Sequence, residues 1–402
     1  MPDLDAIRFR FPALAGDTVF FENAGGSQVP AVVGDAVRDY MLHTYVQLGV
    51  DYELSRRCSA LVDRAHDFIR LLVNGDDVGE VVLGASCSSL CLMLADAYAR
   101  VLGPGDEIVV AEAGHEANVG PWTHLADRGV TLRTWRVDPD SGRANLQGLA
   151  DVLSERTRIV TFPHVSNLVG EIVDVQAATA LAHEVGAKVV VDGVAYAPHR
   201  AMDVKAWGVD WYVYSTYKVY GPHMGALFGR HEAFAELEGP NHFFVPKDEI
   251  PWKFELGGVS HEGCAGLLAL GEYLCFLAGH EAFSRQTVVD AFAVMTACEQ
   301  PLLERLLGFL REHPRARIVG PDRPAPDRVG TVSFVHESKT SAEIAAAAHA
   351  EEIAIRSGHM YAWHQCKAMG IDPLDGVVRA SFVHYNTPDE MERFVELLDR
   401  VL

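Results

Sequence analysis

The stretch YSTYKVYGPHMGALFG (residues 214–229) places one lysine, Lys218, among serine, threonine and tyrosine hydroxyls. Such neighbours are unusual for a solvent-facing lysine, and they suit an amine that attacks a carbonyl group while the hydroxyls bind an anion. Earlier in the chain, the apolar run KVVV leads directly into one carboxylate, Asp192. We therefore expect the amine and the acid to hold opposite ends of one ligand.

Polar residues follow other apolar runs as well, at Cys87, Ser88, His115, Asn167, Ser215 and Tyr217. Each of them alone has a structural explanation, such as a helix cap, a buried histidine or a loop residue. Ligands of open α/β sheets bind beyond the carboxyl ends of the strands, where a helix N-terminus can also hold a phosphate. Together these residues would supply phosphate binding, ring stacking, contact with a ring hydroxyl, a partner for a ring nitrogen and a Schiff-base lysine. Pyridoxal 5'-phosphate (PLP) requires this combination.

Short runs rich in Val and Ile alternate with helix-period segments over the first two thirds of the chain. The apolar runs are EVVLG, DEIVVAE, TRIVTFP, KVVVDG, DWYVYS and MGALFG. Helical periodicity marks SSLCLMLADAYARVL, residues 117–128 and DVQAATALAHEVG. This alternation predicts an α/β fold with a mostly parallel sheet that helices cover on both faces.

From about residue 265 the pattern changes to long helical stretches, two short strands and a capped final helix, NTPDEMERFVELLDRVL. We predict a smaller α+β domain there. The expected organisation is an N-terminal segment (1–30) that contributes to the small domain and the active site, a large cofactor-binding domain (31–264) and a small C-terminal domain (265–402).

The composition suits a large globular protein, because 49% of the 402 residues are hydrophobic and 22% are charged. A formal net charge of −21 disfavours binding to nucleic acid or to an anionic membrane surface. The first residues lack the pattern of a signal peptide, and no apolar run approaches the roughly 20 residues that span a bilayer. We expect a soluble cytoplasmic protein.

The cysteine and glycine patterns argue against a metal site and against two nucleotide-binding classes. Seven cysteines are scattered without a C-x-x-C pair, which fits neither a disulfide framework nor a thiolate zinc site. The chain also lacks H-E-x-x-H, a G-x-G-x-x-G after a strand and a P-loop. We therefore expect no metal ligands.

Segments along most of the chain resemble the class V aminotransferase family of fold-type I PLP enzymes, in particular its cysteine-desulfurase-like branch. The matching segments are FFENAGGSQVP, GASCSS, GHEANVGPW, HVSNLVG, VDGVAYAPHRAMDV, STYKVYGP, IRSGH and VVRASFVHYNT. The resemblance implies a large domain with a sheet of the seven-stranded type, a smaller α+β domain, PLP as cofactor and an amino-acid substrate. It also implies a homodimer whose active sites lie near the subunit interface.

The resemblance assigns a role to each candidate residue. Lys218 would bond to the cofactor aldehyde and serve as the catalytic base, while Asp192 would pair with the pyridine nitrogen. His115 would stack on the ring, and Asn167 would contact both the ring hydroxyl and the substrate. The phosphate would be held by Cys87, Ser88, Ser215 and Tyr217.

The substrate side combines two arginines with a departure from the family pattern. Arg379 would bind the substrate carboxylate through its planar fork, and Arg356 would lie near it. The family reads roughly RTGHHCA where this chain reads RSGHMYA, so Tyr361 stands at the position of the nucleophilic cysteine. Cys366, in WHQCKAM, would reach the site only if that loop folds differently.

Further departures affect the cofactor contacts. Ala195 replaces a glutamine that would hydrogen-bond the ring hydroxyl, and Tyr217 replaces a histidine but can still donate to phosphate. Gly258 falls where the family often has a threonine that reaches the phosphate of the partner subunit. Ser260 or His261 would then have to compensate.

The missing cysteine favours a C–S lyase that acts on cysteine or a cysteine S-conjugate by Cα deprotonation and β-elimination. Tyr361 would then protonate the leaving thiolate or pack over the pocket mouth. The alternatives are a cysteine desulfurase that uses Cys366, and an aminotransferase, epimerase or decarboxylating deaminase acting on another amino acid. A hypothesis of a different class is a catalytically retired PLP-fold binding dimer.

Overall fold

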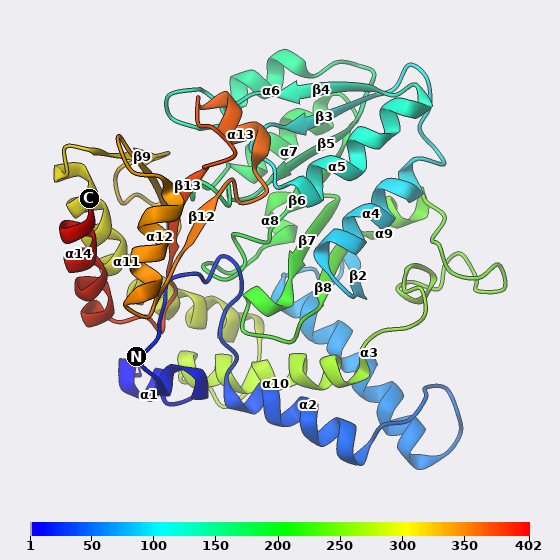
Figure 1. Cartoon of the computed structure of the whole chain (residues 1–402). Coiled ribbons are helices and arrows are strands. Elements are labelled where there is room, and N and C mark those ends of the chain that lie inside the picture. The colour runs from blue at the N-terminus through cyan, green and yellow to red at the C-terminus, as the bar shows by residue number, and fades with distance from the viewer. Residues whose placement is uncertain (1) are drawn as a thin grey trace.

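The computed structural model describes residues 2–402 and contains a seven-stranded sheet at its centre (Figure 1). Along the sheet the order is β2 (Gly79–Gly84), β8 (Gly225–Arg230), β7 (Trp211–Ser215), β6 (Lys188–Asp192), β5 (Thr157–Pro163), β3 (Glu107–Ala111) and β4 (Thr131–Trp135). Strand β8 is antiparallel to both of its neighbours, and the remaining strands share one direction. The predicted α/β fold with a mostly parallel sheet is confirmed.

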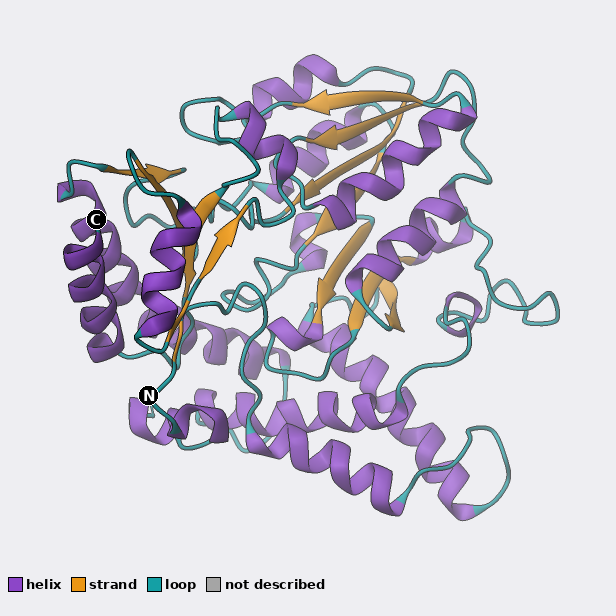
Figure 2. Cartoon of the chain, viewed as in Figure 1, coloured by secondary structure: helices purple, strands orange, loops and turns teal. Residues whose placement is uncertain are grey.

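Both faces of this sheet are covered, which explains why its strands read as apolar runs rather than as an alternating pattern. In β6, Val189 and Val191 enter one hydrophobic cluster, whereas Val190 enters another on the opposite face. Figure 2 shows helices on both sides of the strands. The helices of this part are α2 (Ala31–His43), α3 (Glu53–Leu72), α4 (Cys87–Tyr98), α5 (Glu116–Thr123), α6 (Leu146–Val152), α7 (Val175–Glu184), α8 (Val204–Trp207), α9 (His231–Ala235) and α10 (His261–Ala278).

A second, antiparallel sheet lies in the C-terminal part, in the order β12 (Arg356–Gly358), β13 (Val377–Ser381), β10 (Thr331–His336) and β9 (Ala316–Val319). The helices there are α11 (Arg285–Glu312), α12 (Ser341–Ala350), α13 (Trp363–Ala368) and α14 (Pro388–Val401). Leucines of α11 and α14 pack against β10 and β13 in one apolar cluster. This arrangement forms the α+β portion at the left of Figure 1.

The N-terminal segment links the two portions. After α1 (Leu4–Arg8), strand β1 (Val19–Phe20) pairs in parallel with β11 (Ile353–Ala354). Backbone hydrogen bonds then tie Phe21 and Asn23 to Ser381 at the end of β13. Residues near position 22 therefore lie beside the small sheet although more than 300 positions separate them in sequence.

The expected boundary between residues 264 and 265 falls inside α10. That helix packs along α2 and α3 of the large portion, as the lower part of Figure 1 shows. The long α11 follows it and runs from the large portion into the small one. The division into domains at residue 265 stays a prediction.

Residues 2–402 contain neither a membrane-spanning helix nor a cluster of metal-ligating side chains. No helix combines the length and the apolar character that crossing a bilayer demands. No group of three or more His, Cys, Asp or Glu side chains is arranged to hold a metal ion.

Replacing Gly225 by alanine should destabilise the contact between β8 and the start of α4. A Cβ atom at residue 225 would lie 2.5 Å from the carbonyl carbon of Ser86 and 2.6 Å from the amide nitrogen of Cys87. We expect the free energy of unfolding, measured in urea, to fall by about 2 kcal/mol, as overpacking does elsewhere.

The matched control is Gly308→Ala in α11, where a Cβ atom would meet nothing within 4 Å. Alanine in a helix interior should raise the free energy of unfolding by about 0.5–1 kcal/mol. Equal unfolding midpoints for the two variants would contradict this account of Gly225.

Candidate active site

A pocket opens beyond the carboxyl ends of the parallel strands. All eight residues predicted to hold the cofactor line it, namely Lys218, Asp192, Cys87, Ser88, His115, Asn167, Ser215 and Tyr217. They come from the ends of β2, β3, β5, β6 and β7 or from the segments that directly follow. Because these strands share one direction, their ends meet at one edge of the sheet.

The N-terminus of α4 forms one side of this pocket. Ser86 is the N-cap and exchanges hydrogen bonds with Ser89 in a capping box, so these two hydroxyls are already engaged. The next residues, Cys87 and Ser88, face the pocket at the positive end of the helix dipole. A hydrogen bond with Cys91 and burial raise the pKa of the Cys87 thiol well above its usual value. Cys87 is therefore a neutral donor suited to a phosphate rather than a nucleophile.

Lys218 ends a short 3₁₀ helix (Thr216–Lys218) after β7. Thr216 anchors this turn, because its amide donates to the Met224 carbonyl at 3.0 Å and its own carbonyl accepts from the Gly221 amide at 3.0 Å. Lys218 is partly accessible through the pocket, yet protein surrounds its amine. Burial and the nearby Arg379 guanidinium lower the pKa of Lys218 to about 8. The amine is thus readily available in its neutral, nucleophilic form.

Asp192 is the last residue of β6 and is 5% exposed. One carboxylate oxygen accepts from the Val194 amide at 2.9 Å, and no ion pair within residues 2–402 neutralises the group. Burial raises the pKa of Asp192, although Val194 and Lys218 oppose that shift. A buried carboxylate in this position calls for a cationic partner, and a protonated ring nitrogen would be one.

His115 is the N-cap of α5, where its Nδ1 accepts from the Ala117 amide at 3.0 Å. This bond assigns the ring hydrogen to Nε2. Burial, together with the positive charges of Lys218 and Arg379, lowers the pKa of His115 to about 4. The imidazole is therefore neutral near pH 7, as a ring that stacks on an aromatic cofactor should be.

Asn167 and Arg379 connect the pocket to the small sheet. The Asn167 side-chain amide donates to the Met360 carbonyl at 2.6 Å, and its Oδ1 is buried without a partner among the described residues. Arg379, on β13, donates to the Asn167 carbonyl at 3.0 Å. Burial and the proximity of Arg356 lower the pKa of Arg379 to about 10, so the guanidinium stays charged near neutral pH.

Tyr361 lies at the edge of the site, with its ring centroid 5.0 Å from that of His115. Its φ angle is +60°, and that of the preceding Met360 is +51°, so two consecutive residues adopt the left-handed region. Their carbonyls are held in place, because Met360 accepts from Asn167 and Tyr361 accepts from the Glu116 amide at 2.9 Å. Such local strain is common at functional sites.

Cys366 lies apart from the pocket. It is fully buried on α13 within an apolar cluster that includes Leu168 and Met360. Burial raises the pKa of its thiol to about 11. Helix α13 therefore does not present this sulfur to the pocket in the observed conformation.

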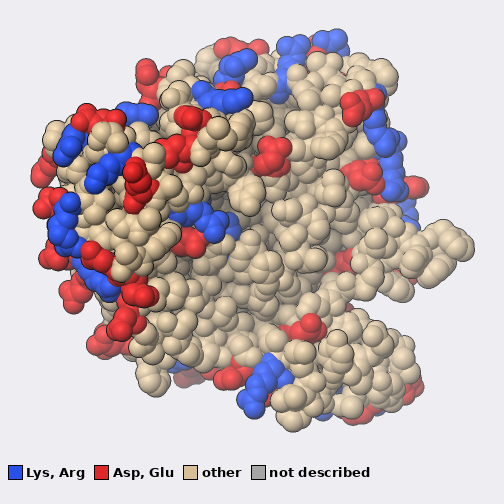
Figure 3. All heavy atoms as spheres, in the orientation of Figure 1, with Lys and Arg blue, Asp and Glu red and all other residues tan. Residues whose placement is uncertain are grey.

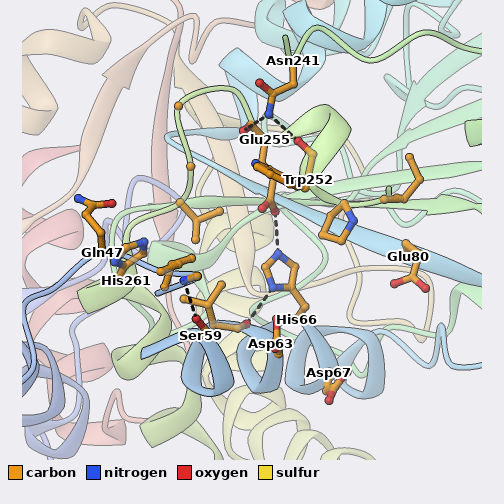
Figure 4. Close-up of a pocket in the computed structure, with 18 of the residues that line it drawn as sticks. Gln47, Ser59, Asp63, His66, Asp67, Glu80, Asn241, Trp252, Glu255 and His261 are labelled. Carbon is orange, nitrogen blue, oxygen red and sulfur yellow. Dashed lines mark hydrogen bonds and ion pairs between the residues drawn. The ribbon is translucent and has the colours of Figure 1, made fainter. Parts of the chain in front are cut away.

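The other residues that differ from the family pattern lie in two places, some in the cofactor pocket and the others around a second hollow. Ala195 and Tyr217 line the pocket. Gly258 and His261 line a separate hollow of about 900 Å³, and Ser260 is the N-cap of α10. Figure 4 shows this hollow, where His66 of α3 points toward Glu255 at 2.7 Å. Within one chain, none of the residues 258, 260 and 261 lines the cofactor pocket.

Other residues near the strand ends escaped prediction or took another role. His164 follows β5, but it is buried, stacks on Tyr196 at 3.6 Å and bonds Tyr212 at 3.0 Å. Glu22 was not predicted, and its carboxylate lies 2.7 Å from Arg356. Its position depends on the contact between the N-terminal segment and β13, for which no local sequence signal exists.

The residues of the pocket fit PLP. Neutral donors at a helix N-terminus suit its phosphate, the uncompensated Asp192 carboxylate suits its ring nitrogen, and the neutral His115 ring suits its face. The Lys218 amine with its lowered pKa suits the aldehyde.

The comparisons with known proteins agree with this geometry. The model of the family "Aminotransferase class-V" matches residues 19–394. The chain is 36% identical to the aminotransferase-like protein FGM3 of Gibberella zeae, over 99% of this chain and 98% of that protein. It is 30% identical to a cysteine desulfurase of Serratia proteamaculans, over 99% of this chain and 98% of that one.

A solved structure has a similar fold over nearly the whole length. The apo cysteine desulfurase from Thermococcus onnurineus NA1 superposes with a TM-score of 0.89 at 25% identity, covering 100% of this chain and 98% of that one. Sequence, fold and pocket thus identify a PLP-dependent, cysteine-desulfurase-like enzyme of fold type I, and the chain belongs to the class V aminotransferase family.

Proposed function

We propose that this enzyme is a C–S lyase, which removes a sulfur substituent from Cβ of cysteine or of a cysteine S-conjugate by β-elimination. The observation that carries the proposal is Tyr361, whose ring adjoins His115 where the family pattern has a nucleophilic cysteine. β-Elimination requires a base and an electron sink but no thiol nucleophile.

PLP, when bound, supplies the electron sink that stabilises negative charge at Cα. Lys218 and Asp192 would hold its aldehyde and ring nitrogen, His115 and Asn167 its ring, and the α4 N-terminus its phosphate. Arg379 holds the substrate carboxylate and thereby orients the Cα–H bond toward Lys218. The Lys218 amine takes the Cα proton, the Cβ–S bond breaks, and the thiolate leaves with the bonding electrons.

Tyr361 is suited to the second proton transfer. Tyr361 is 59% exposed beside His115, so its hydroxyl can exchange protons with solvent. Donation to the departing thiolate gives a neutral thiol. Water then hydrolyses the released enamine to a keto acid and ammonia, so the overall products are the thiol, the keto acid and ammonia.

A cysteine desulfurase that uses Cys366 is the second candidate, because relatives at 30% identity carry that name. That reaction would leave the sulfur on Cys366 and release alanine. It would require α13 to open, since the thiol is fully buried and its pKa is raised to about 11.

A product assay with L-cysteine and S-methylcysteine distinguishes the two candidates. We expect keto acid without alanine from the wild type, and unchanged products from Cys366→Ser. Replacing Tyr361 by phenylalanine should lower kcat by about 10²-fold, the usual size of a general-acid contribution, whereas a packing role would leave kcat nearly unchanged. Alanine formation that disappears in Cys366→Ser would instead support the desulfurase.

The rate should depend on pH through the Lys218 amine. Because its pKa is about 8 and the neutral amine is the base once substrate has replaced it on the cofactor, kcat should rise about tenfold per pH unit below pH 8 and level off above it. Lys218→Ala should lose both turnover and the yellow colour of the bound cofactor. A profile that is flat from pH 6 to pH 10 would contradict the role of Lys218 as the base.

We further propose that two copies associate through the surface around the hollow of Figure 4. The segments that line it, or directly adjoin those that do, carry exposed apolar side chains at the end of α2, on the α2–α3 connection and on the 239–258 loop, namely Leu42, Tyr45, Val50, Phe243, Phe244, Trp252 and Leu256. The projection at the right edge of Figure 3 is drawn mostly in tan on the face shown, and the exposed charges of the loop are Lys247, Asp248 and Glu249. Exposed apolar patches of this kind are typical of subunit interfaces.

The 239–258 loop is held in shape before any partner binds. The buried Lys253 amine donates to the carbonyls of Asn241, His242 and Val245 at 3.0–3.1 Å. A preorganised loop loses little conformational entropy on association. Gly258 and His261 lie on the same surface, so this dimer would bring them near the second subunit.

Sedimentation analysis tests this interface. The wild type should sediment as a dimer, and Phe243→Glu should shift it toward monomer, since a charge would be buried in the contact. The control is Leu374→Glu, an equally drastic change at a side chain that is 83% exposed in the small portion. If the wild type is a monomer, or if both variants dissociate equally, this surface is not the dimer interface.

A further inference from the structure

Two arginines face each other across the small sheet beside the pocket. Strands β12 and β13 are antiparallel, and their register places Arg356 directly opposite Arg379. Residues directly opposite in such a pair project to the same face, where like charges destabilise one another. Arg356 also lowers the pKa of Arg379. The pair therefore needs negative charge nearby.

The N-terminal segment supplies one negative charge through Glu22. A β-bridge joins Glu22 to Ser381, two residues beyond Arg379 on β13. Its carboxylate oxygen Oε1 lies 2.7 Å from an Nη atom of Arg356, close enough for an ion pair although the angle is not that of a hydrogen bond. A Cβ atom at Gly25 would overlap this oxygen, so the glycine leaves room for the carboxylate.

The two guanidiniums consequently differ in what they offer a ligand. Arg379 is 3% exposed, donates to the Asn167 carbonyl and keeps its Nε buried without a partner among the described residues. Arg356 is 47% exposed at its side chain and already paired with Glu22. A carboxylate can thus complete the hydrogen bonds of Arg379, whereas Arg356 is neutralised.

We propose that Glu22 is a specificity-determining residue, which keeps Arg356 occupied so that the site selects amino acids with a single acidic group. The carboxylate of a substrate with one acidic group compensates the positive charge of Arg379. A second acidic group at the side chain would meet the Glu22 carboxylate beside Arg356, and the repulsion would oppose binding. This inference rests on the proposed action on amino acids and narrows the substrate to those with an uncharged side chain, such as cysteine and its S-alkyl conjugates.

A matched pair of ligands tests the proposal without any elimination. Isovaline and 2-methylaspartate differ only in a terminal methyl or carboxylate, and neither has a Cα hydrogen to lose. Their dissociation constants can be measured with PLP-loaded protein through the change in cofactor absorbance. Wild type should bind isovaline about tenfold more tightly, the size expected for one repulsive contact at a partly exposed site.

Variants then locate the effect. Glu22→Gln should free Arg356, so that 2-methylaspartate binds more tightly and the preference for isovaline disappears or reverses. The double variant Glu22→Gln with Arg356→Gln should lose this gain in affinity for 2-methylaspartate. The control is Glu351→Gln, which breaks the exposed ion pair with Arg400, 2.8 Å long, outside the pocket. That variant should behave as wild type.

Three results would overturn the proposal: equal or tighter binding of 2-methylaspartate by wild type, no change in preference in Glu22→Gln, or a gain that survives the loss of Arg356. Because neither ligand can undergo elimination, the outcome does not depend on the reaction proposed above. If wild type prefers isovaline as expected but forms no keto acid from S-methylcysteine, the C–S lyase proposal would be contradicted while the role of Glu22 would stand.

Discussion

The shared direction of β2, β3, β5, β6 and β7 is the constraint on which the site depends. Each strand carries one to three of the site residues at its carboxyl end or just beyond it, and parallel alignment brings those ends to a common edge. Hydrophobic burial on both faces stabilises that alignment, as the opposite orientations of Val189 and Val190 illustrate. The apolar strands thus do more than form a core, since they set the separations between the polar groups that follow them.

Burial of charge is the second determinant of the chemistry. Lys218, Asp192 and Arg379 are removed from water at a cost that a ligand must offset, and each carries a shifted pKa as a result. The lowered pKa of Lys218 makes a neutral amine available, while the unneutralised Asp192 carboxylate favours a cationic ring nitrogen. The same low-dielectric surroundings that activate these groups also make the empty arrangement unfavourable, which explains why cofactor and substrate charges complement it.

The edge of the site is where this chain departs from the family pattern. Tyr361 takes the place of a nucleophilic sulfur, and the nearby Cys366 thiol is withdrawn into an apolar cluster. Beside them, Glu22 of the N-terminal segment lies within ion-pair distance of Arg356. The residues predicted to hold the cofactor come from the large sheet, whereas this edge is built from the N-terminal segment and the small portion.

Local sequence was sufficient for much of the large portion. Runs such as KVVVD identified the strands, several polar residues shortly after these runs proved to line the pocket, and the motif around Lys218 indicated the cofactor. These features depend on contacts close in sequence or on strand direction alone, so periodicity and motif spacing reveal them. Tertiary structure decided the rest: the antiparallel insertion of β8, the packing of α10 on the large portion, the burial of Cys366 and the meeting of Glu22 with Arg356. Each of these arises from contacts between segments distant in sequence, whose geometry no local pattern encodes.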